Sequence, residues 1–395
     1  MQRTTLTLVV VGGIAWTSLT LIALQLSEGS AVGFDLELLL QAGRDVAAGR
    51  SPYDPAMLAG AAPQSTSLFY SYPPPVAQLL APFAAIPSAV MLVGWWAGAV
   101  AALVIVGEGL RRRLAPERSA ARLALAALAL APLVLPFTVG LLFGNLDAWF
   151  PFLYGVMVLA VVQPARTTAF GGGIALALAS LKLHPASLGL WFLVRGMRGD
   201  RHALRVAAIA VAAGILVIVA SVLLGGVALW SEYALIVQAG SGADIVDPRN
   251  AGPAAVITTL IGGDEPSARA IHVGVGIAAV AVTILAAWRR RDPLESFGWA
   301  AAASLATLPV TWYHYPSALI PIALAALLRA PVERRDQVRV LVLAAGVTAA
   351  VALPALPLLW VAVALVIAAA VCSSSCEQID CPSPTSRSLW CSSPR

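Results

Sequence analysis

The polar residues that interrupt the apolar segments of this sequence are the first candidates for chemistry. Lys182 lies inside an apolar stretch that runs from residue 170 to residue 194, and His184 follows two residues later. A lysine in apolar surroundings is energetically costly and by default indicates a functional site. An ammonium group near an imidazole is suited to binding a phosphate or a pyrophosphate. The alternative is structural: the lysine only extends its ammonium group to the membrane surface.

Asp35 is the second candidate, because a regularly spaced set of apolar residues follows it. Apolar side chains at positions 36, 39, 40, 46 and 47 predict a short amphipathic helix that lies in the membrane interface. An aspartate at the start of a helix is a favoured N-cap. A carboxylate held directly above a membrane is also suited to act as a general base. The two roles do not exclude each other, and the residues alone leave both open.

Four further polar residues lie at expected boundaries between apolar segments: Tyr72, Asn145, Arg249 and His314. Tyr72 is either an anchor at the membrane surface or a platform on which a sugar stacks. Asn145 either shapes a tight turn together with its neighbours, or it or Asp147 bonds a sugar hydroxyl. Arg249 is either a solvated loop charge or a contact for an acceptor, and His314 is either bonded within the protein or in contact with a phosphate leaving group. With the two residues of the 170–194 stretch, these are the predicted substrate-binding residues.

The composition places all of these residues in a membrane protein. Of 395 residues, 59% are hydrophobic and only 11% are charged, and the mean hydropathy is +0.84. A soluble domain is roughly 25% charged. The apolar blocks have the length of membrane-crossing helices, and the alternating ten-residue segments of an outer-membrane barrel are absent. The net charge of +5 comes from cations in short loops, so we expect no nucleic-acid partner.

The apolar segments predict an all-α bundle of about twelve transmembrane helices with both chain ends in the cytoplasm. The triple-arginine clusters at 111–113 and 289–291 mark the inner side. The first helix, over 6–26, is expected to remain uncleaved. Further helices are expected at 88–107, 123–143, 148–162, 203–224, 268–288, 294–310, 315–328, 340–353 and 357–371.

The stretch over 170–194 is expected to form a hairpin of two short helices. Arginines precede and follow it, and a single span would place one of these clusters outside. A break near His184 and Pro185 keeps both inside, and Pro185 favours that break because it has no amide donor. Short half-helices need protein or a wet cavity around their ends. The prediction therefore places Lys182 and His184 at a cavity.

Residues 372–395 form a Ser-, Cys- and Pro-rich tail after a transmembrane domain over 1–371. All four cysteines lie in it (Cys372, Cys376, Cys381 and Cys391). Their spacing matches no standard zinc pattern. The composition predicts a disordered segment or the product of a shifted reading frame, and the alternative is a weak metal or palmitoylation site.

Motifs spread along the chain resemble, in their order, those of glycosyltransferase family 87, whose members use polyprenyl-phosphate-mannose and have the GT-C membrane fold. The resemblance extends over about residues 6–328. It depends on the Asp35 region, GRSPYD at 49–54, YPP at 72–74, GNLD at 144–147, the 171–185 segment that ends in LKLHP, and WYHY at 312–315.

The resemblance implies a multi-pass enzyme of the cell membrane with its active site on the outer face. It would move a mannosyl residue from polyprenyl-phosphate-mannose to a glycolipid or lipoglycan, with α-1,2 linkage; arabinose is the main rival sugar. Asp35 would be the catalytic base, while Lys182 and His314 would stabilise the leaving phosphate. No cofactor and no metal are expected, since the chain has neither a nucleotide-sugar domain nor a DxD motif.

Two other functions compete with this one. A transporter or a lipid-linked-sugar flippase would also explain Lys182 and the broken helices, but it predicts two related halves, and the sequence has no clear internal repeat. A membrane scaffold subunit would leave Lys182 without a role.

Overall fold

The computed structural model describes residues 2–27, 32–61, 69–240 and 244–374. Within these ranges the chain forms α-helices and short 3₁₀ helices and no β-strand, so the predicted all-α class is confirmed. Only residues 372–374 of the predicted tail lie within the described ranges. Cys376, Cys381 and Cys391 lie outside them.

Four helices of the described residues are long and apolar enough to cross a membrane, judged by length and composition. They are α1 (Gln2–Ser27), α5 (Ser88–Leu114), α11 (Arg201–Gly240) and α13 (Glu265–Arg289). The described residues contain a fifth span only if a sharply bent pair of helices is counted as a single span. The predicted number of about twelve spans is therefore not confirmed.

The shorter helices are α2 (Phe34–Ala47), α3 (Pro55–Leu58), α4 (Pro74–Leu80), η1 (Ala81–Phe83), η3 (Leu146–Trp149), α8 (Phe150–Val162), α12 (Pro253–Ile261), α14 (Pro293–Ala306), η5 (Tyr315–Leu319), α15 (Ile320–Arg329), η6 (Val332–Arg334), α16 (Arg335–Val351) and α17 (Leu358–Cys372).

The bent pair replaces the single helix that was predicted over 123–143. It consists of α6 (Ala120–Leu130) and α7 (Leu135–Phe143), joined through η2 (Ala131–Leu133) at an angle of 73°. The prediction of one helix was wrong because Pro132 and Pro136 remove two amide donors in succession. Thr138 satisfies one carbonyl at the bend by donating from Oγ1 to the Pro132 oxygen at 2.8 Å.

The predicted hairpin in the 170–194 stretch is confirmed. Its first arm is α9 (Arg166–Ala179), continued by η4 (Ser180–Lys182), and its second arm is α10 (Ala186–Met197). Both arms of the hairpin pack against the first part of α11. A methyl group added at Gly173 would lie 2.6 Å from Ile209, and one added at Gly196 would lie 2.9 Å from Leu204. The arms therefore run out and back, and residues 182–185 form the tip.

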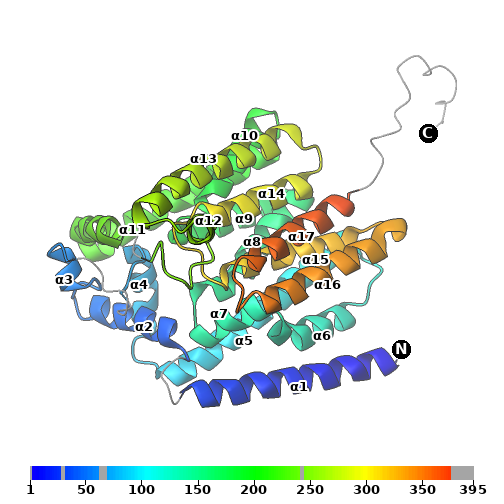
Figure 1. The fold of residues 1–395 in the computed structure, drawn as a ribbon, viewed down its shortest axis with the longest axis horizontal. Helices are drawn as coiled ribbons and strands as arrows, with labels where there is room; N and C mark the ends of the chain where they lie inside the picture. The colour runs from blue at the N-terminus through cyan, green and yellow to red at the C-terminus, as the bar shows by residue number, and fades with distance from the viewer. Residues whose placement is uncertain (1, 28–31, 62–68, 241–243, 375–395) are drawn as a thin grey trace.

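The two ends of the bundle differ in the residues that they collect. Figure 1 shows α2, α3 and α4 together with the last part of α11 at one end, on the left, while α1 begins and α17 ends on the right. At that second end, Arg329 bonds Asp292 and Ser373, each at 2.8 Å, and Arg195 donates to the Arg290 carbonyl. The basic end and the end that carries Asp35 therefore lie on opposite sides of the bundle.

The protein core surrounds α8 and the hairpin. Trp191 packs edge-on against Phe192 and Phe297, with ring centroids 4.9 and 5.3 Å apart, and donates its indole N–H to Ser296 Oγ at 2.8 Å. In a membrane, such close packing and internal hydrogen bonding replace the hydrophobic driving force between helices. The hairpin that carries Lys182 is therefore fixed from its base.

Candidate active site

Asp35 lies inside the first turn of α2 and does not cap it. The N-cap position is Gly33, which makes no side-chain cap. The carboxylate of Asp35 instead accepts a hydrogen bond from Asn145 Nδ2 at 2.6 Å. The N-cap interpretation was therefore wrong, because a partner 110 residues away holds the side chain. Burial raises the pKa of Asp35, while the hydrogen bond from Asn145 acts in the opposite direction.

The turn that carries Asn145 lies directly against α2. Gly144 ends α7 with a φ of 68°, a left-handed conformation that suits glycine. A methyl group added there would lie 2.5 Å from Leu36 Cβ, so a side chain would separate the turn from α2. Asn145 is further fixed because its Oδ1 accepts from the Asp147 amide at 3.0 Å and its carbonyl accepts from Trp95 at 3.2 Å.

A buried ion pair lies next to this turn. Lys182, the only lysine of the chain, contacts Asp147 through its ammonium group and also donates to Asn145 Oδ1 at 3.3 Å. His314 Nε2 lies 3.1 Å from the same carboxylate oxygen of Asp147. The side chain of Asp147 is 0% exposed, and that of Lys182 is 10% exposed. Three distant segments thus meet on one carboxylate, and the hairpin tip contributes the cation.

Aromatic rings enclose the ammonium group of Lys182. Its Nζ lies 4.2 Å from the centre of the Tyr315 ring and 5.7 Å from that of Tyr72. Such rings attract a cation through their negative faces. The ring of His184 stacks on the ring of Tyr315: the ring centres are 5.8 Å apart, and the two ring planes are inclined by only 6°. Neither ring nitrogen of His184 has a hydrogen-bond partner among the described residues.

The backbone at the hairpin tip is strained. The amide of His184 donates to the carbonyl of Lys182 at 2.8 Å, which closes a three-residue γ-turn. The central residue, Leu183, has a φ of 64° and a ψ of −57°. This form of the γ-turn is rare and strained for a residue with a side chain. The strain lies between the lysine and the histidine that the sequence singled out.

The structure brings six of the seven predicted site residues into one cluster and separates Arg249 from it. The polar cluster, as we call it, consists of Asp35, Tyr72, Asn145, Lys182, His184 and His314 together with Asp147 and Tyr315. Arg249 is 70% exposed, pairs with Asp247 at 2.7 Å and lies over the ring of Trp312. The side chain of Arg249 is thus an exposed charge paired within its own loop, and it makes no contact with the polar cluster among the described residues.

Asp147 was predicted only as an alternative to Asn145 for bonding a sugar hydroxyl, not as the partner of Lys182, and Tyr315 was not among the predicted site residues. A signal for Asp147 was present: an acidic residue flanked by apolar segments needs a buried partner, and Lys182 was the obvious unpaired cation. Tyr315 gave no comparable signal, because aromatic residues at a membrane boundary are common anchors.

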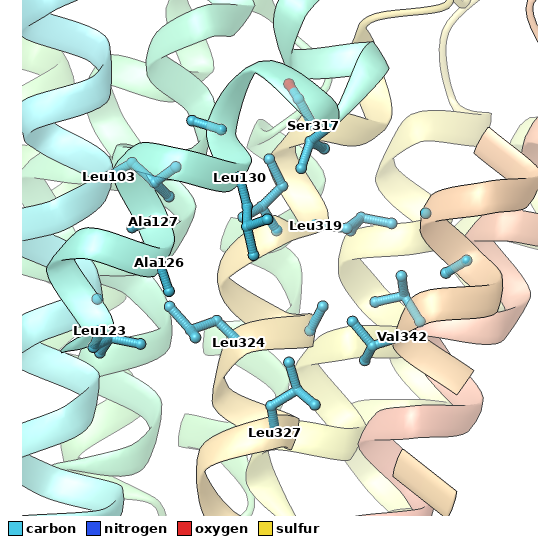
Figure 2. A pocket seen from close by; sticks show the side chains of 18 of the residues that line it. Leu103, Leu123, Ala126, Ala127, Leu130, Ser317, Leu319, Leu324, Leu327 and Val342 are labelled. Atoms are coloured by element: carbon cyan, nitrogen blue, oxygen red, sulfur yellow. The ribbon is translucent and has the colours of Figure 1, made fainter. Parts of the chain in front are cut away.

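An apolar cavity of about 600 Å³ adjoins the polar cluster. Figure 2 shows Leu103, Leu123 and Ala127 on one wall and Leu319, Leu324 and Val342 toward the other, with Ser317 at one end. Ser317 also donates from Oγ to the backbone carbonyl of Asp147 at 3.3 Å. The cavity, which α5, α6, α15 and α16 line, therefore begins at a residue that touches the polar cluster.

Comparisons with known proteins identify the family of the chain. No curated protein sequence matches it. The model of glycosyltransferase family 87 matches residues 70–311, which is more than half of the chain and includes the turn at Asn145 and the hairpin with Lys182. The chain therefore belongs to glycosyltransferase family 87 and is a membrane glycosyltransferase.

Proposed function

We propose that this protein transfers a mannosyl residue from polyprenyl-phosphate-mannose to a hydroxyl group of a glycolipid or lipoglycan on the outer face of the cell membrane, with an α-1,2 linkage. The observation that carries the proposal is the amide of Asn145, which contacts Asp35 with its nitrogen and Lys182 with its oxygen. A base and a cation are thus held one side chain apart, as a displacement at a sugar phosphate requires.

Asp35 acts as the general base in this mechanism. The oxygen of the acceptor hydroxyl bonds to C1 of the donor sugar while the bond from C1 to the phosphate oxygen breaks. The hydroxyl proton passes to Asp35, and the lipid phosphate leaves with the electron pair. A positioned base contributes about 10²–10⁴-fold to such a step.

Lys182 and His314 stabilise the negative charge that develops on the phosphate. Both already face an anionic oxygen, that of Asp147, and a preorganised donor needs little reorganisation during the reaction. The walls of Tyr315 and Tyr72 keep the ammonium group of Lys182 away from bulk water, where its charge would be screened. Asp147 is a positioning residue, since one of its carboxylate oxygens faces both the Lys182 ammonium group and the His314 ring.

The apolar cavity supports a donor with a hydrocarbon chain. Its small lining residues, many of them alanines, form a smooth channel that ends at Ser317 beside the polar cluster. Lipid chains and apolar side chains are equally apolar, so such a channel gains little affinity in a bilayer. Its contribution is to direct the chain so that the phosphate reaches Lys182.

The test is a product analysis with purified protein and a panel of polyprenyl-phosphate sugars that includes mannose and arabinose. We expect transfer from the mannose donor, and an Asp35→Asn variant that lowers the rate by about 10²–10⁴-fold. Asp45→Asn is the matched control: Asp45 lies on the same helix and pairs with Arg50 at 2.5 Å. It should retain nearly full activity.

A folded Asp35→Asn variant with full transfer would contradict the role of Asp35. Transfer from the arabinose donor alone would contradict the choice of sugar. Uptake into liposomes without a covalent product would favour a transporter, a class that the family does not favour.

A further inference from the structure

A carboxylate without a cation lies on the last part of α11. Glu232 accepts a hydrogen bond from Ser51 Oγ at 2.7 Å, and no arginine, lysine or histidine of the described residues forms an ion pair with it. Glu232 is partly exposed and lies in the last part of α11, after a break at Gly226 where the backbone leaves helical geometry (φ 78°, ψ 169°). The mechanism proposed above makes no use of it.

A row of aromatic side chains connects Glu232 to the polar cluster. Ring centres are 5.7 Å apart from Tyr72 to Tyr70, 5.6 Å from Tyr70 to Tyr53 and 6.2 Å from Tyr53 to Tyr233. Trp230 continues the row at 6.1 Å from Tyr233. We call these five residues the aromatic row. Its members come from the first long loop and from α11, which meet at the end of the bundle that carries Asp35 (Figure 1).

The members of the row differ in exposure, which divides them into a support and a surface. Tyr53 and Tyr70 are each 3% exposed and form the support. The Tyr53 hydroxyl also donates to the Tyr72 carbonyl at 3.1 Å, which fixes the loop. Tyr72, Tyr233 and Trp230 are partly exposed, as is Glu232. Partly exposed polar and aromatic groups therefore lie at both ends of the row, Tyr72 at one end and Trp230, Glu232 and Tyr233 at the other, with the buried support between them.

The negative charge of Glu232 determines which kind of ligand can bind beside these rings. A carboxylate without a cation repels a phosphate and accepts hydrogen bonds from hydroxyl groups. Partly exposed aromatic faces offer apolar contact with a fixed orientation. A neutral sugar has both properties, because its ring carries hydroxyl groups at the edge and an apolar face. Aromatic anchors in a membrane interface would explain the tyrosines and the tryptophan, but they require no carboxylate.

We infer that the aromatic row and Glu232 bind the neutral sugar portion of the acceptor, an inference that rests on the proposed function. Tyr72 belongs both to the row and to the polar cluster, where it lies 5.7 Å from Lys182 Nζ. An acceptor held on the row therefore reaches the polar cluster at Tyr72. The two substrates are separated by charge: the anionic donor lies at the cations, and the neutral acceptor lies at Glu232.

The experiment measures sugar binding and transfer separately. Saturation-transfer NMR with methyl α-mannoside and a dimannoside reports binding to the protein in nanodiscs, and it does not depend on catalysis. We expect both probes to bind to the wild type and to the Asp35→Asn variant. Glu232→Gln, which keeps the shape of the side chain, should weaken dimannoside binding and raise the acceptor KM by about tenfold or more, since a hydrogen bond to a charged group is lost. The KM of the donor should not change.

Matched variants separate this role from a structural one. Tyr233→Ala removes an exposed ring and should also raise the acceptor KM, while Tyr233→Phe keeps the ring and should have little effect. Glu265→Gln is the control for charge, because Glu265 is exposed and pairs with Arg269 at 2.7 Å. It should leave both KM values unchanged.

Three results would overturn the inference: no binding of either probe to the wild type, equal binding by the Glu232→Gln variant, or a parallel rise of the donor KM. Failure of the proposed function has a different signature. If Asp35→Asn retains full transfer while Glu232→Gln still loses sugar binding, the mechanism fails and the sugar site stands.

Discussion

Asn145 donates to the carboxylate of Asp35 at 2.6 Å although the two residues are 110 positions apart. The same amide accepts a contact from Lys182 at 3.3 Å. The polar cluster is therefore connected through one neutral side chain, and a change at Asn145 should affect Asp35, the proposed base, and Lys182 together.

The pH dependence of the reaction should report this connection. Burial raises the pKa of Asp35 above its usual value, so the base form is lost, as pH falls, at a higher pH than for an exposed aspartate near 3.9. The acidic limb of kcat/KM should therefore lie above that value. Asn145→Ala removes a donor that favours the charged form, so the pKa of Asp35 should rise further and the limb should move to higher pH.

The control for this measurement is the residual activity of Asp35→Asn, which should have no such limb. A limb that stays in place in the Asn145→Ala variant would mean that the hydrogen bond does not control the base.

The ion pair between Lys182 and Asp147 should appear as a coupling in stability. Lys182→Met leaves a fully buried carboxylate without its cation, and such a change destabilises a protein by about 3–5 kcal/mol. Asp147→Asn alone should also destabilise the protein. The double variant should lose much less than the sum of the two, as measured by unfolding in mixed micelles. Additive losses would show that the two side chains act independently.

Lys182 also offers a chemical probe, because it is the only lysine of the chain. An amine-acylating reagent can modify only this side chain and the terminal amine, and peptide mass spectrometry distinguishes the two. We expect polyprenyl phosphate to slow the acylation of Lys182 and to leave the terminal amine unaffected. Equal rates with and without the lipid would argue against phosphate binding at Lys182.

The strained turn at Leu183 should respond to glycine in particular. Leu183→Ala and Leu183→Gly remove the same exposed side chain, which is 56% accessible in the native protein. Only glycine adopts the positive φ without strain, which typically amounts to about 1–3 kcal/mol. The greater freedom of glycine in the unfolded chain offsets about 0.5–1 kcal/mol of this gain. The glycine variant should therefore be the more stable of the two by about 1 kcal/mol, and an equal stability would count against strain.

Local patterns in the sequence predicted much of the fold and part of the site. Charges on both sides of the 170–194 stretch predicted the hairpin, because the positive-inside pattern acts on each loop separately. The same reasoning placed Lys182 at the tip. The bend between α6 and α7 was not predicted, because an apolar run of suitable length conceals the effect of its prolines.

The long-range contacts of the site could not be predicted in the same way. Nothing near Asp35 in the sequence indicates that its carboxylate would accept a hydrogen bond from Asn145 and would not cap the helix. The separation of Arg249 from the cluster depends on Asp247, which lies two residues away and bonds it in place. Single residues can be recognised by their energetic cost, whereas their partners depend on how distant segments pack.

The contact between Gly144 and α2 makes residue 144 a spacer. The missing side chain lets Leu36 approach the turn, and the adjacent residues on both sides, Asp35 and Asn145, come within hydrogen-bonding distance as a result. The approach of Asp35, the proposed base, to Asn145 thus depends on the bulk of one residue that takes no part in the proposed chemistry. Enlarging that residue would widen the active site while every reacting group stays in the chain.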